Sequence, residues 1–573
     1  MKIKLPKAIK GFSFSRLYSF EMNNFEVEAL LPALFYLIRT GGKRRGRLVD
    51  ATVIDARRDS LANHNKLTGF DDSEGKRSLD KWIRTSFIAT AARGRGHRKG
   101  EQIFYIRPLS FLSYKPGFPA EGRRVRGVPL FLYHILSEGL EDEPAWSPTH
   151  GLRYLRDAFT EGLVLDSAAT YSGRYDEHTP LDIETVGLLY YLDGFENCPP
   201  SATQARKPPP AALERSANRI VEDVRRLVSV YHGRVPDRTL AQFLTGLLNF
   251  EMFVYTLELQ HVVNRLVDDG EVEPWWNSGQ DDMPSPVRFY VNLVGDRRHQ
   301  SARMAQEQVE AHFAGVQRFC RNNLLLRTLH RYWQTSNSIA LQTPRTGEDY
   351  MWLLRQRNQP ITIARAGVEL EQIRLENGIE ELEQMPEDFA AIWNAPAEDD
   401  FERIMHVLEE AQRSRNVSDM LSWYRSVGGL VRSDGILQGN LRGRRAWRLH
   451  MSEGLLEILV QLCCITPGYA DVKADTDHHL ANLRPRPVSL TDFLRFLEER
   501  YGIIVDRPPD WMGSVENVAA AKENFEALKR RLRQMGVFED LSDDFNAQYI
   551  EPRYADEREA EPQEPVREVS RRD

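Results

Sequence analysis

Apolar residues recur at helical spacing almost without a break from about residue 211 to residue 430. Between Pro236 and Asp269 they repeat at i, i+3 and i+4, which puts them on one face of a long helix. The same pattern predicts further helices over residues 213–231, 301–333, 346–356, 399–413 and 418–426. Long helices that are joined by short polar loops predict a helical bundle over residues 211–440. No repeat of roughly 30 to 45 residues accompanies the pattern, which argues against a solenoid.

Residues 1–195 have a different, loop-rich pattern that predicts a mixed α/β region. An apolar helix is predicted over residues 25–38, and short β-like runs cover residues 48–54 and 102–106. Prolines cluster in residues 198–210, where they exclude both helix and strand. This proline-rich segment is the predicted boundary between the N-terminal region and the helical bundle.

Residues 445–550 carry three helical patterns, which are followed by two short apolar runs around a Ser-Asp-Asp turn. The predicted elements are helices over 451–464, 489–501 and 515–535, and a hairpin over 537–550. Three helices and a hairpin are the outline of a winged helix. Residues 551–573 are charged and almost free of apolar side chains, so a disordered tail is predicted there. The chain is thus predicted to be mainly α, with a mixed α/β basic N-terminal region, a helical-bundle middle and a winged-helix C-terminal domain.

The formal net charge of −7 hides a strong division of charge along the chain. Residues 1–126 contain 26 lysine and arginine residues against 12 aspartate and glutamate residues, a net charge of +14. The remaining 447 residues therefore carry −21. Because a basic surface concentrates polyanions around it, this division points to a nucleic-acid partner for the N-terminal region.

Three basic loops of the N-terminal region, all containing glycine, are the predicted nucleic-acid-binding residues. They comprise Lys43, Arg44, Arg45 and Arg47, then Arg93, Arg95, Arg98 and Lys99, and finally Arg123, Arg124 and Arg126. Glycine lets a backbone approach a polyanion closely, and arginine forms strong hydrogen bonds to phosphate oxygens. The loops lack the G-x-x-x-x-G-K-[ST] spacing of a P-loop, so nucleotide hydrolysis has no support. We expect nonspecific phosphate contacts with DNA, while the acidic remainder of the chain binds other protein subunits.

Two other function classes fit the same sequence. In the first, the chain is a protein–protein scaffold whose basic region docks an acidic partner or its own acidic half, which leaves no nucleic-acid site. In the second, it is a divergent metal-dependent nuclease, which requires Asp50, Asp55 or Glu101 to converge near Lys99. No Ser/His/Asp or Cys/His arrangement has a local signature. A non-enzymatic role is therefore the favoured interpretation.

The third predicted helix of the C-terminal region carries a cationic stripe. It consists of Lys522, Lys529, Arg530, Arg531 and Arg533. In a winged helix this stripe would contact phosphates, but Asp540, Asp543 and Asp544 in the wing would repel them. Positive residues late in a helix also favour its dipole without any ligand. A winged helix that binds protein is therefore at least as well supported as one that binds DNA.

One cluster has the residue types of a divalent-metal site: Asp471, Asp475, Asp477, His478 and His479. The cluster lies in a proline-flanked segment without a regular pattern, and a polar loop is the favoured interpretation. No metal and no cofactor are predicted.

Several features indicate a reducing cytoplasm and no contact with a membrane. No run approaches the roughly 18 apolar residues that a membrane span needs. The N-terminus lacks the apolar stretch of a secretory signal. Trp275 and Trp276 are predicted to pack in the helical domain or, if exposed, to anchor an interface. The cysteines are few and scattered, as expected of reduced thiols: Cys198, Cys320, Cys463 and Cys464.

The segment from Leu528 to Tyr549, LKRRLRQMGVFEDLSDDFNAQY, resembles segments in large accessory proteins of bacterial anti-phage defence islands. The methylation-associated defence systems are the family it resembles. This resemblance implies a cytoplasmic component that acts beside a DNA methyltransferase and effector proteins. It includes no catalytic motif, so it assigns no functional residue. Together with the charge division, it predicts a non-enzymatic, DNA-associated accessory component of a defence complex.

Overall fold

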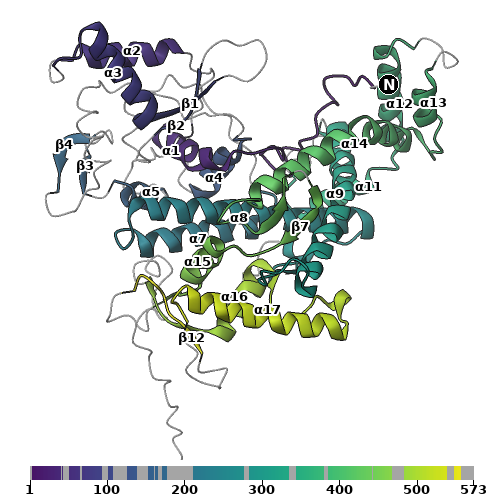
Figure 1. Cartoon of the computed structure of the whole chain (residues 1–573). Helices are drawn as coiled ribbons and strands as arrows, with labels where there is room; N and C mark the ends of the chain where they lie inside the picture. Colours follow the sequence, from purple (N-terminus) through teal and green to yellow (C-terminus); the bar gives the residue numbers. More distant parts are fainter. Residues whose placement is uncertain are drawn as a thin grey trace, which may run out of the picture. The chain divides into compact units, whose positions relative to one another are not determined.

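Helices make up most of the described residues, whose strands form six two-stranded sheets beside two isolated bridges (Figure 1). The computed structural model describes residues 3–40, 42, 51–64, 68–92, 101–106, 125–137, 152–160, 162–165, 171–176, 211–276, 283–334, 344–379, 385–441, 443–467, 483–538 and 548–555. The proline-rich segment 198–210, the acidic and histidine cluster 471–479 and the tail from residue 556 lie outside these ranges. The prediction of a mainly α chain is confirmed.

The chain divides into two units, and each is built from three separate segments. Unit 1 comprises Met1–Val221, Asn249–Pro286 and Glu310–Gly428, and unit 2 comprises Glu222–Leu248, Val287–Val309 and Gly429–Asp573. Three long helices contribute residues to both units. They are α7 (Glu214–Tyr231), α8 (Asp237–Asn264) and α9 (Gln300–Trp333).

The N-terminal part of unit 1 mixes helices with two small antiparallel sheets. Its helices are η1 (Val27–Ala29), α1 (Leu30–Thr40), α2 (Ala51–Ala62), α3 (Ser73–Trp82), η2 (Ile83–Phe87), α4 (Val128–Leu136) and α5 (Arg153–Ala158). Its strands are β1 (Ile88–Ala92), β2 (Glu101–Ile106), β3 (Leu163–Leu165) and β4 (Tyr171–Tyr175), which pair as β1–β2 and β3–β4. The predicted helix at 25–38 and the predicted strand at 102–106 are confirmed.

The β-like run predicted over residues 48–54 is wrong from Ala51 on, where α2 begins. Helical spacing buries Ile54 and Leu61, which lie seven residues apart, at 1% and 0% exposure. Two turns of helix bring such residues to one face, whereas strand spacing would place them on opposite faces. The short apolar run that suggested a strand is therefore the buried face of a helix.

The remaining helices of unit 1 include α11 (Gly347–Arg355), α12 (Pro360–Glu376), α13 (Glu387–Trp393) and α14 (Asp400–Val427). Thr346 caps α11 in a reciprocal capping box with Asp349, so the predicted start of that helix is confirmed. The helices predicted separately over 399–413 and 418–426 are one helix, α14. No glycine or proline interrupts this stretch, and the weak helix formers Ser414, Asn416 and Ser418 do not break it.

A hydrophobic core joins the start of the chain to these helices. Ile3, Leu5 and Ile9 pack with buried residues of α9, α12 and α14, among them Leu370 and Phe401. Polar contacts fix the same segment, since Asn323 donates to the Phe12 carbonyl over 2.8 Å. The core of this part of unit 1 is thus completed by residues more than 300 positions away along the chain.

Helix α8 and its π-helical continuation η4 (Arg265–Asp269) form the most apolar helical segment. Within the described residues, Asp237–Asp269 is one segment that is long and apolar enough to cross a membrane. The prediction that no segment approaches the length and apolar character of a membrane span is therefore wrong by these two criteria. However, 89% of its most apolar window is buried inside the structure, as expected for the core helix of a bundle.

Unit 2 contains three further helices and four small sheets. The helices are α15 (Glu453–Cys463), α16 (Leu490–Tyr501) and α17 (Val515–Gln534), with a 3-10 turn, η8, at Asp510–Met512. The antiparallel pairs are β6 (Leu437–Asn440) with β7 (Gly443–Leu449), β8 (Ile465–Pro467) with β9 (Leu483–Pro485), and β10 (Val488–Ser489) with β12 (Tyr549–Ile550). The three predicted helices are confirmed, with Ser489 as the cap of α16 and Gly536 after α17 at a φ of +70°.

A winged helix is not seen in the described part of residues 445–550. Strand β12, which the prediction placed in the wing, pairs with β10 ahead of α16. Strand β11 (Ile503–Ile504) pairs in parallel with β5 (Phe289–Tyr290), more than 200 positions earlier in the chain. Of the predicted hairpin, an antiparallel bridge between Phe538 and Ile550 is present. The C-terminal helices therefore share their small sheets with distant segments.

Asn524 of α17 holds this arrangement together. Its Oδ1 accepts a hydrogen bond from the Leu293 amide over 2.6 Å. Its Nδ2 donates to the carbonyls of Val291 and Val505, over 2.9 and 3.0 Å. The side chain is completely buried, so one carboxamide satisfies three backbone groups that have no access to water.

Candidate functional site

Ten of the eleven predicted phosphate-binding residues lie outside the described residues. They are Lys43, Arg44, Arg45, Arg47, Arg93, Arg95, Arg98, Lys99, Arg123 and Arg124. The eleventh, Arg126, donates from Nη1 to Glu21 Oε2 over 3.0 Å and from Nε to the Asn24 carbonyl over 2.9 Å. Its guanidinium is thus engaged by its own unit. Whether the other ten bind phosphate stays a prediction.

The described part of residues 1–126 is close to electrically neutral. Within residues 1–126, the described positions contain 12 lysine and arginine residues and 10 aspartate and glutamate residues. The net charge of these described positions is +2, and the other +12 belongs to the part of residues 1–126 that lies outside the described ranges. One segment of that part, 93–100, joins Ala92 to Glu101, which are paired across the β1–β2 sheet. Most of the basic excess of residues 1–126 therefore lies outside the described residues.

Arginines of α2 and of the turn after α3 are paired within the described part of this region. Arg58 lies 3.0 Å from Asp55, 3.1 Å from Asp59 and 3.7 Å from Asp80. Arg84 donates to Asp80 over 2.9 Å. The hydrogen bond with Asp59 raises the pKa of Arg58 above its ordinary value. Arg58 therefore links α2 to α3, and Arg84 is paired with the end of α3.

One of the carboxylates that the nuclease hypothesis requires is paired with an arginine. Asp55 accepts a hydrogen bond from Arg58 Nη1. Asp50 and Lys99 lie outside the described residues, and so does the side chain of Glu101. The described part of the chain also holds no group of three or more His, Cys, Asp or Glu residues that could bind a metal ion. The other metal candidate, the segment 471–479, lies outside that part of the chain.

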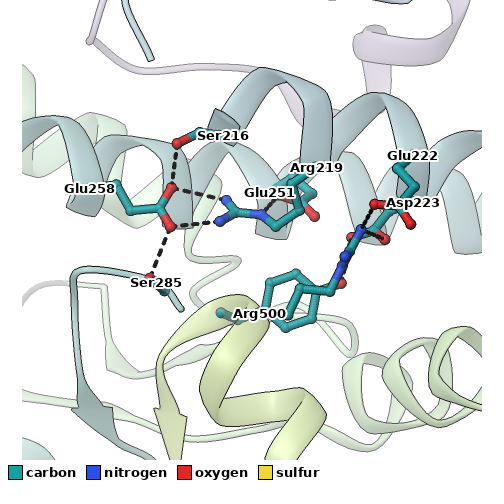
Figure 2. Close-up of polar contacts among 9 residues, drawn as sticks. Ser216, Arg219, Glu222, Asp223, Glu251, Glu258, Ser285 and Arg500 are labelled. Atoms are coloured by element: carbon teal, nitrogen blue, oxygen red, sulfur yellow. Dashed lines mark hydrogen bonds and ion pairs between the residues drawn. The ribbon is translucent and has the colours of Figure 1, made fainter. Parts of the chain in front are cut away.

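A buried ionic network in unit 1 was not predicted (Figure 2). Arg219 of α7 donates from Nε to Glu251 over 3.1 Å, and from Nη1 and Nη2 to the two oxygens of Glu258 over 2.6 and 3.1 Å. Ser216 and Ser285 donate to the same carboxylate, over 2.8 and 2.9 Å. Arg219 is 6% exposed, and both glutamates are completely buried. The network fixes the first turns of α7 to the second half of α8.

The hydrogen bonds that the Glu258 carboxylate accepts indicate the role of this network. Each oxygen of Glu258 accepts one hydrogen bond from Arg219 and one from a serine. A carboxylate that is saturated in this way is held in place, which suits a structural role. The sequence did contain a signal, because Glu251 and Glu258 stand seven residues apart in the most apolar helix of the chain.

A second network lies in unit 2 and uses the next turn of α7 (Figure 2). Arg500 of α16 contacts Asp223 through two nitrogens and Glu222 over 2.9 Å. Tyr501 donates to Asp223 over 2.6 Å. Burial lowers the pKa of Arg500, but the charge of Asp223 outweighs it, and the pKa lies well above its ordinary value. Here too, a buried arginine has carboxylate partners.

The cationic stripe predicted for α17 is largely used inside unit 2. Lys529 pairs with Glu526 over 2.6 Å, and Arg533 lies over the ring of Phe538. Arg531 donates to the Met451 carbonyl over 3.1 Å. Lys522 and Arg530 are exposed. The five residues therefore do not act as one surface.

The structure tests the predictions for the tryptophan pair and for the cysteines. Trp275 and Trp276 are buried at 7% and 3% exposure, so their packing role is confirmed. Cys320, Cys463 and Cys464 are buried free thiols, as predicted. Burial raises the pKa of the Cys320 and Cys463 thiols to about 12, which keeps them protonated and unreactive at neutral pH.

Comparison with known proteins concerns nearly the whole chain. A family model described as methylation-associated defense system protein MAD7 matches residues 7–554. Comparison with curated proteins and with solved structures gives no match. The resemblance of the segment 528–549 thus extends far beyond the C-terminal region. The chain belongs to the MAD7 family of methylation-associated defense system proteins.

Proposed function

We propose that this protein is a non-enzymatic, DNA-associated accessory component of its defence system in the cytoplasm. In this proposal the basic N-terminal segments bind nucleic-acid phosphates, and the acidic helical regions bind other proteins of the system. The observation that carries it is the position of the charge. Residues 1–126 have a net charge of +14, whereas the remaining 447 residues carry −21. A basic region of this kind concentrates polyanions around it.

The proposed mechanism is electrostatic. Lysine and arginine side chains neutralise phosphates and release condensed counterions, so affinity depends steeply on salt. For duplex DNA the logarithm of the binding constant falls with the logarithm of salt by about 0.9 for each phosphate that is neutralised. At about 0.1 M salt, each neutralised phosphate therefore contributes roughly eightfold in affinity. No residue pattern in the chain supports base recognition, so binding should be independent of sequence.

The test is binding of labelled duplex and single-stranded DNA across a salt series. The loop variant replaces Arg44, Arg45, Arg47, Arg95 and Arg98 with alanine. We expect the salt slope to fall by about 0.9 for each phosphate that the variant no longer neutralises, with weaker binding at every salt concentration. Equal affinity and slope for the loop variant and the unmodified protein would contradict the proposed site.

A matched control removes the same formal charge from elsewhere in unit 1. It replaces surface arginines of α9 and α14 that already pair with carboxylates, namely Arg318, Arg321, Arg403, Arg413 and Arg415. Exposed ion pairs of this kind contribute about 0–1 kcal/mol each, so the fold should persist. If this control weakens DNA binding as much as the loop variant, the effect belongs to net charge and the loops are not a site.

One observation favours the scaffold as a second candidate function. Helix α12 exposes three large apolar residues at seven-residue spacing: Ile361, Val368 and Leu375, at 47%, 60% and 62%. This spacing is typical of a helix that packs along a partner helix. The scaffold predicts that V368D loses an amphipathic-helix partner among the other proteins of the defence system upon co-expression. Unchanged co-purification of those proteins would argue against it.

A further inference from the structure

A group of arginines in unit 2 surrounds His450, the residue that follows β7. Arg448 lies two residues earlier, within β7 and opposite Gln438 of β6. Arg531 of α17 places its Nη2 3.4 Å from His450 Nε2. The backbone of His450 forms a parallel bridge with Asn292, which leads into the loop that carries Arg297. Three segments that are distant in sequence thus bring positive charge to one place.

The central arginine is buried without a counter-charge. Arg448 is 7% exposed, and its Nη2 donates to the neutral amide of Gln438. Its Nε has no hydrogen-bond partner among the described residues. No ion pair of Arg448 or Arg531 with a carboxylate occurs in the described part of the chain either, although Glu453 lies near enough to act on Arg531. A buried guanidinium without a counter-ion is costly.

Two other buried arginines of the protein have carboxylate partners. Arg219 contacts two glutamates, and Arg500 contacts Asp223 and Glu222. Carboxylates thus compensate these two arginines, whereas Arg327 of α9 donates to the backbone carbonyls of Ala8, Ile9 and Gly11. The absence of a carboxylate partner at Arg448 within the described ranges leaves a place for an anion from outside the chain.

The charges of the group also act on one another. Burial lowers the pKa of Arg448, and the positive charge of Arg297 lowers it further. Burial lowers the pKa of His450 to about 4, with Arg531 and Arg448 adding to the effect, so His450 is neutral near pH 7. Like charges that repel in this way are relieved when an anion binds between them.

Further exposed arginines lie on the segments around the group, beside the carboxylates of Asp296 and Glu523. Arg444 and Arg445 are exposed on β7, and Arg297 and Arg298 are exposed just ahead of α9. None of these four forms an ion pair with a described residue. The N-terminal end of α9 adds the positive end of a helix dipole near Arg298. The segments that carry the cluster thus hold more arginines than a single phosphate group requires.

We propose that Arg297, Arg448 and Arg531, called the Arg448 cluster, bind phosphates of a nucleic-acid backbone. Planar guanidinium groups match phosphate oxygens in pairs of hydrogen bonds, which lysine-rich or neutral surfaces do not provide. The exposed arginines on β7 and ahead of α9 extend the binding surface to neighbouring phosphates, which favours a strand over a free phosphate or nucleotide. This site lies in unit 2 and does not rest on the N-terminal loops.

The experiment is anisotropy of fluorescein-labelled duplex and single-stranded DNA with full-length protein at about 0.1 M salt. The cluster variant is R297Q/R448Q, made both in the unmodified protein and in the loop variant. We expect the dissociation constant for duplex DNA to rise about eightfold for each phosphate that is no longer neutralised, in both backgrounds. The control R495Q/R507Q removes two positive charges that are exposed and paired elsewhere in unit 2, and should leave it unchanged.

Two further measurements keep the test decisive. If thermal melting shows that R448Q unfolds, R297Q alone is used, because Arg297 is exposed and its replacement should not disturb the core. R448K should restore part of the affinity by restoring the charge. An unchanged dissociation constant for the folded cluster variants in both backgrounds overturns the proposal. Stabilisation by ATP or inorganic phosphate without binding of either oligonucleotide also overturns it, in favour of a small-molecule site.

The experiment distinguishes failure of the N-terminal site from failure of the Arg448 cluster. Weaker binding in the loop variant alone supports the N-terminal site and overturns the Arg448 cluster. Weaker binding in the cluster variant alone overturns the N-terminal site and supports the Arg448 cluster. Additive effects of the two variants support both sites.

Discussion

Replacing Arg219 with methionine should unfold unit 1 far more easily than the change of a single side chain suggests. Methionine fills a similar volume but leaves Glu251 and Glu258 without their cation. Both carboxylates are completely buried, so water cannot solvate their unpaired charges. Removing one partner of a buried ion pair costs about 3–5 kcal/mol, because an uncompensated charge stays behind. Since whole domains are stable by only about 5–15 kcal/mol, this cost is a large fraction of the total.

A triple variant separates the cost of unpaired charge from the contribution of the network. R219M/E251L/E258M removes all three charges and fills the space with apolar side chains. Replacing a whole buried ionic group in this way is often neutral or stabilising. The hydroxyls of Ser216 and Ser285 lose their acceptor, at about 1 kcal/mol each. We therefore expect the triple variant to be clearly more stable than R219M alone.

The assay is urea unfolding followed by tryptophan fluorescence. Trp423 is buried in unit 1 and donates to Thr256 of α8 over 3.0 Å, so it reports on this region. The control R318M removes an exposed arginine that lies 3.8 Å from Asp268, and should shift stability by at most about 1 kcal/mol. A shift for R219M as small as that of R318M would refute the reasoning. So would a triple variant that is less stable than R219M.

Three further outcomes are expected. N524A should lower the stability of unit 2 by about 3 kcal/mol or more, because three buried backbone groups lose their partner, and urea unfolding measures it. T346A should cost about 1 kcal/mol through removal of the α11 cap, which thermal melting detects. Cys463 should resist iodoacetamide at pH 8 until the protein is denatured, as peptide mass spectrometry can show, since burial raises its pKa to about 12. The same raised pKa means that its thiol adds stability at neutral pH, which is lost as pH rises from about 9 towards 12.

The sequence was sufficient for features that depend on neighbouring residues. The apolar spacing of α8, the caps at Thr346 and Ser489 and the glycine after α17 are all local signals, and each was found where expected. Helix ends are set by hydrogen bonds within a few residues, so short patterns identify them. The charge of the N-terminal segments was equally visible, because composition needs no structure.

Where local signals were ambiguous, tertiary packing decided the secondary structure and the strand pairing. The run at 48–54 has the composition of a strand, but burial of Ile54 and Leu61 on one face made it a helix. The polar residues between the two helices predicted in 399–426 were too weak to end α14. The predicted winged helix required the hairpin over 537–550 to supply its wing, whereas β12 pairs with β10 ahead of α16. Local propensity differs by less than about 1 kcal/mol per residue, so tertiary contacts override it.

The ionic networks and the Arg448 cluster became visible only in the tertiary structure. Arg219 meets Glu258 across 39 positions, and Arg500 meets Asp223 across 277. In the Arg448 cluster, Arg297, Arg448 and Arg531 come from three segments of the chain. The sequence states how much charge the protein carries, but the cost of a charge depends on burial and on the partner that folding supplies. That is why the sequence determined the helices and the basic composition, and only the fold decided which arginines are compensated.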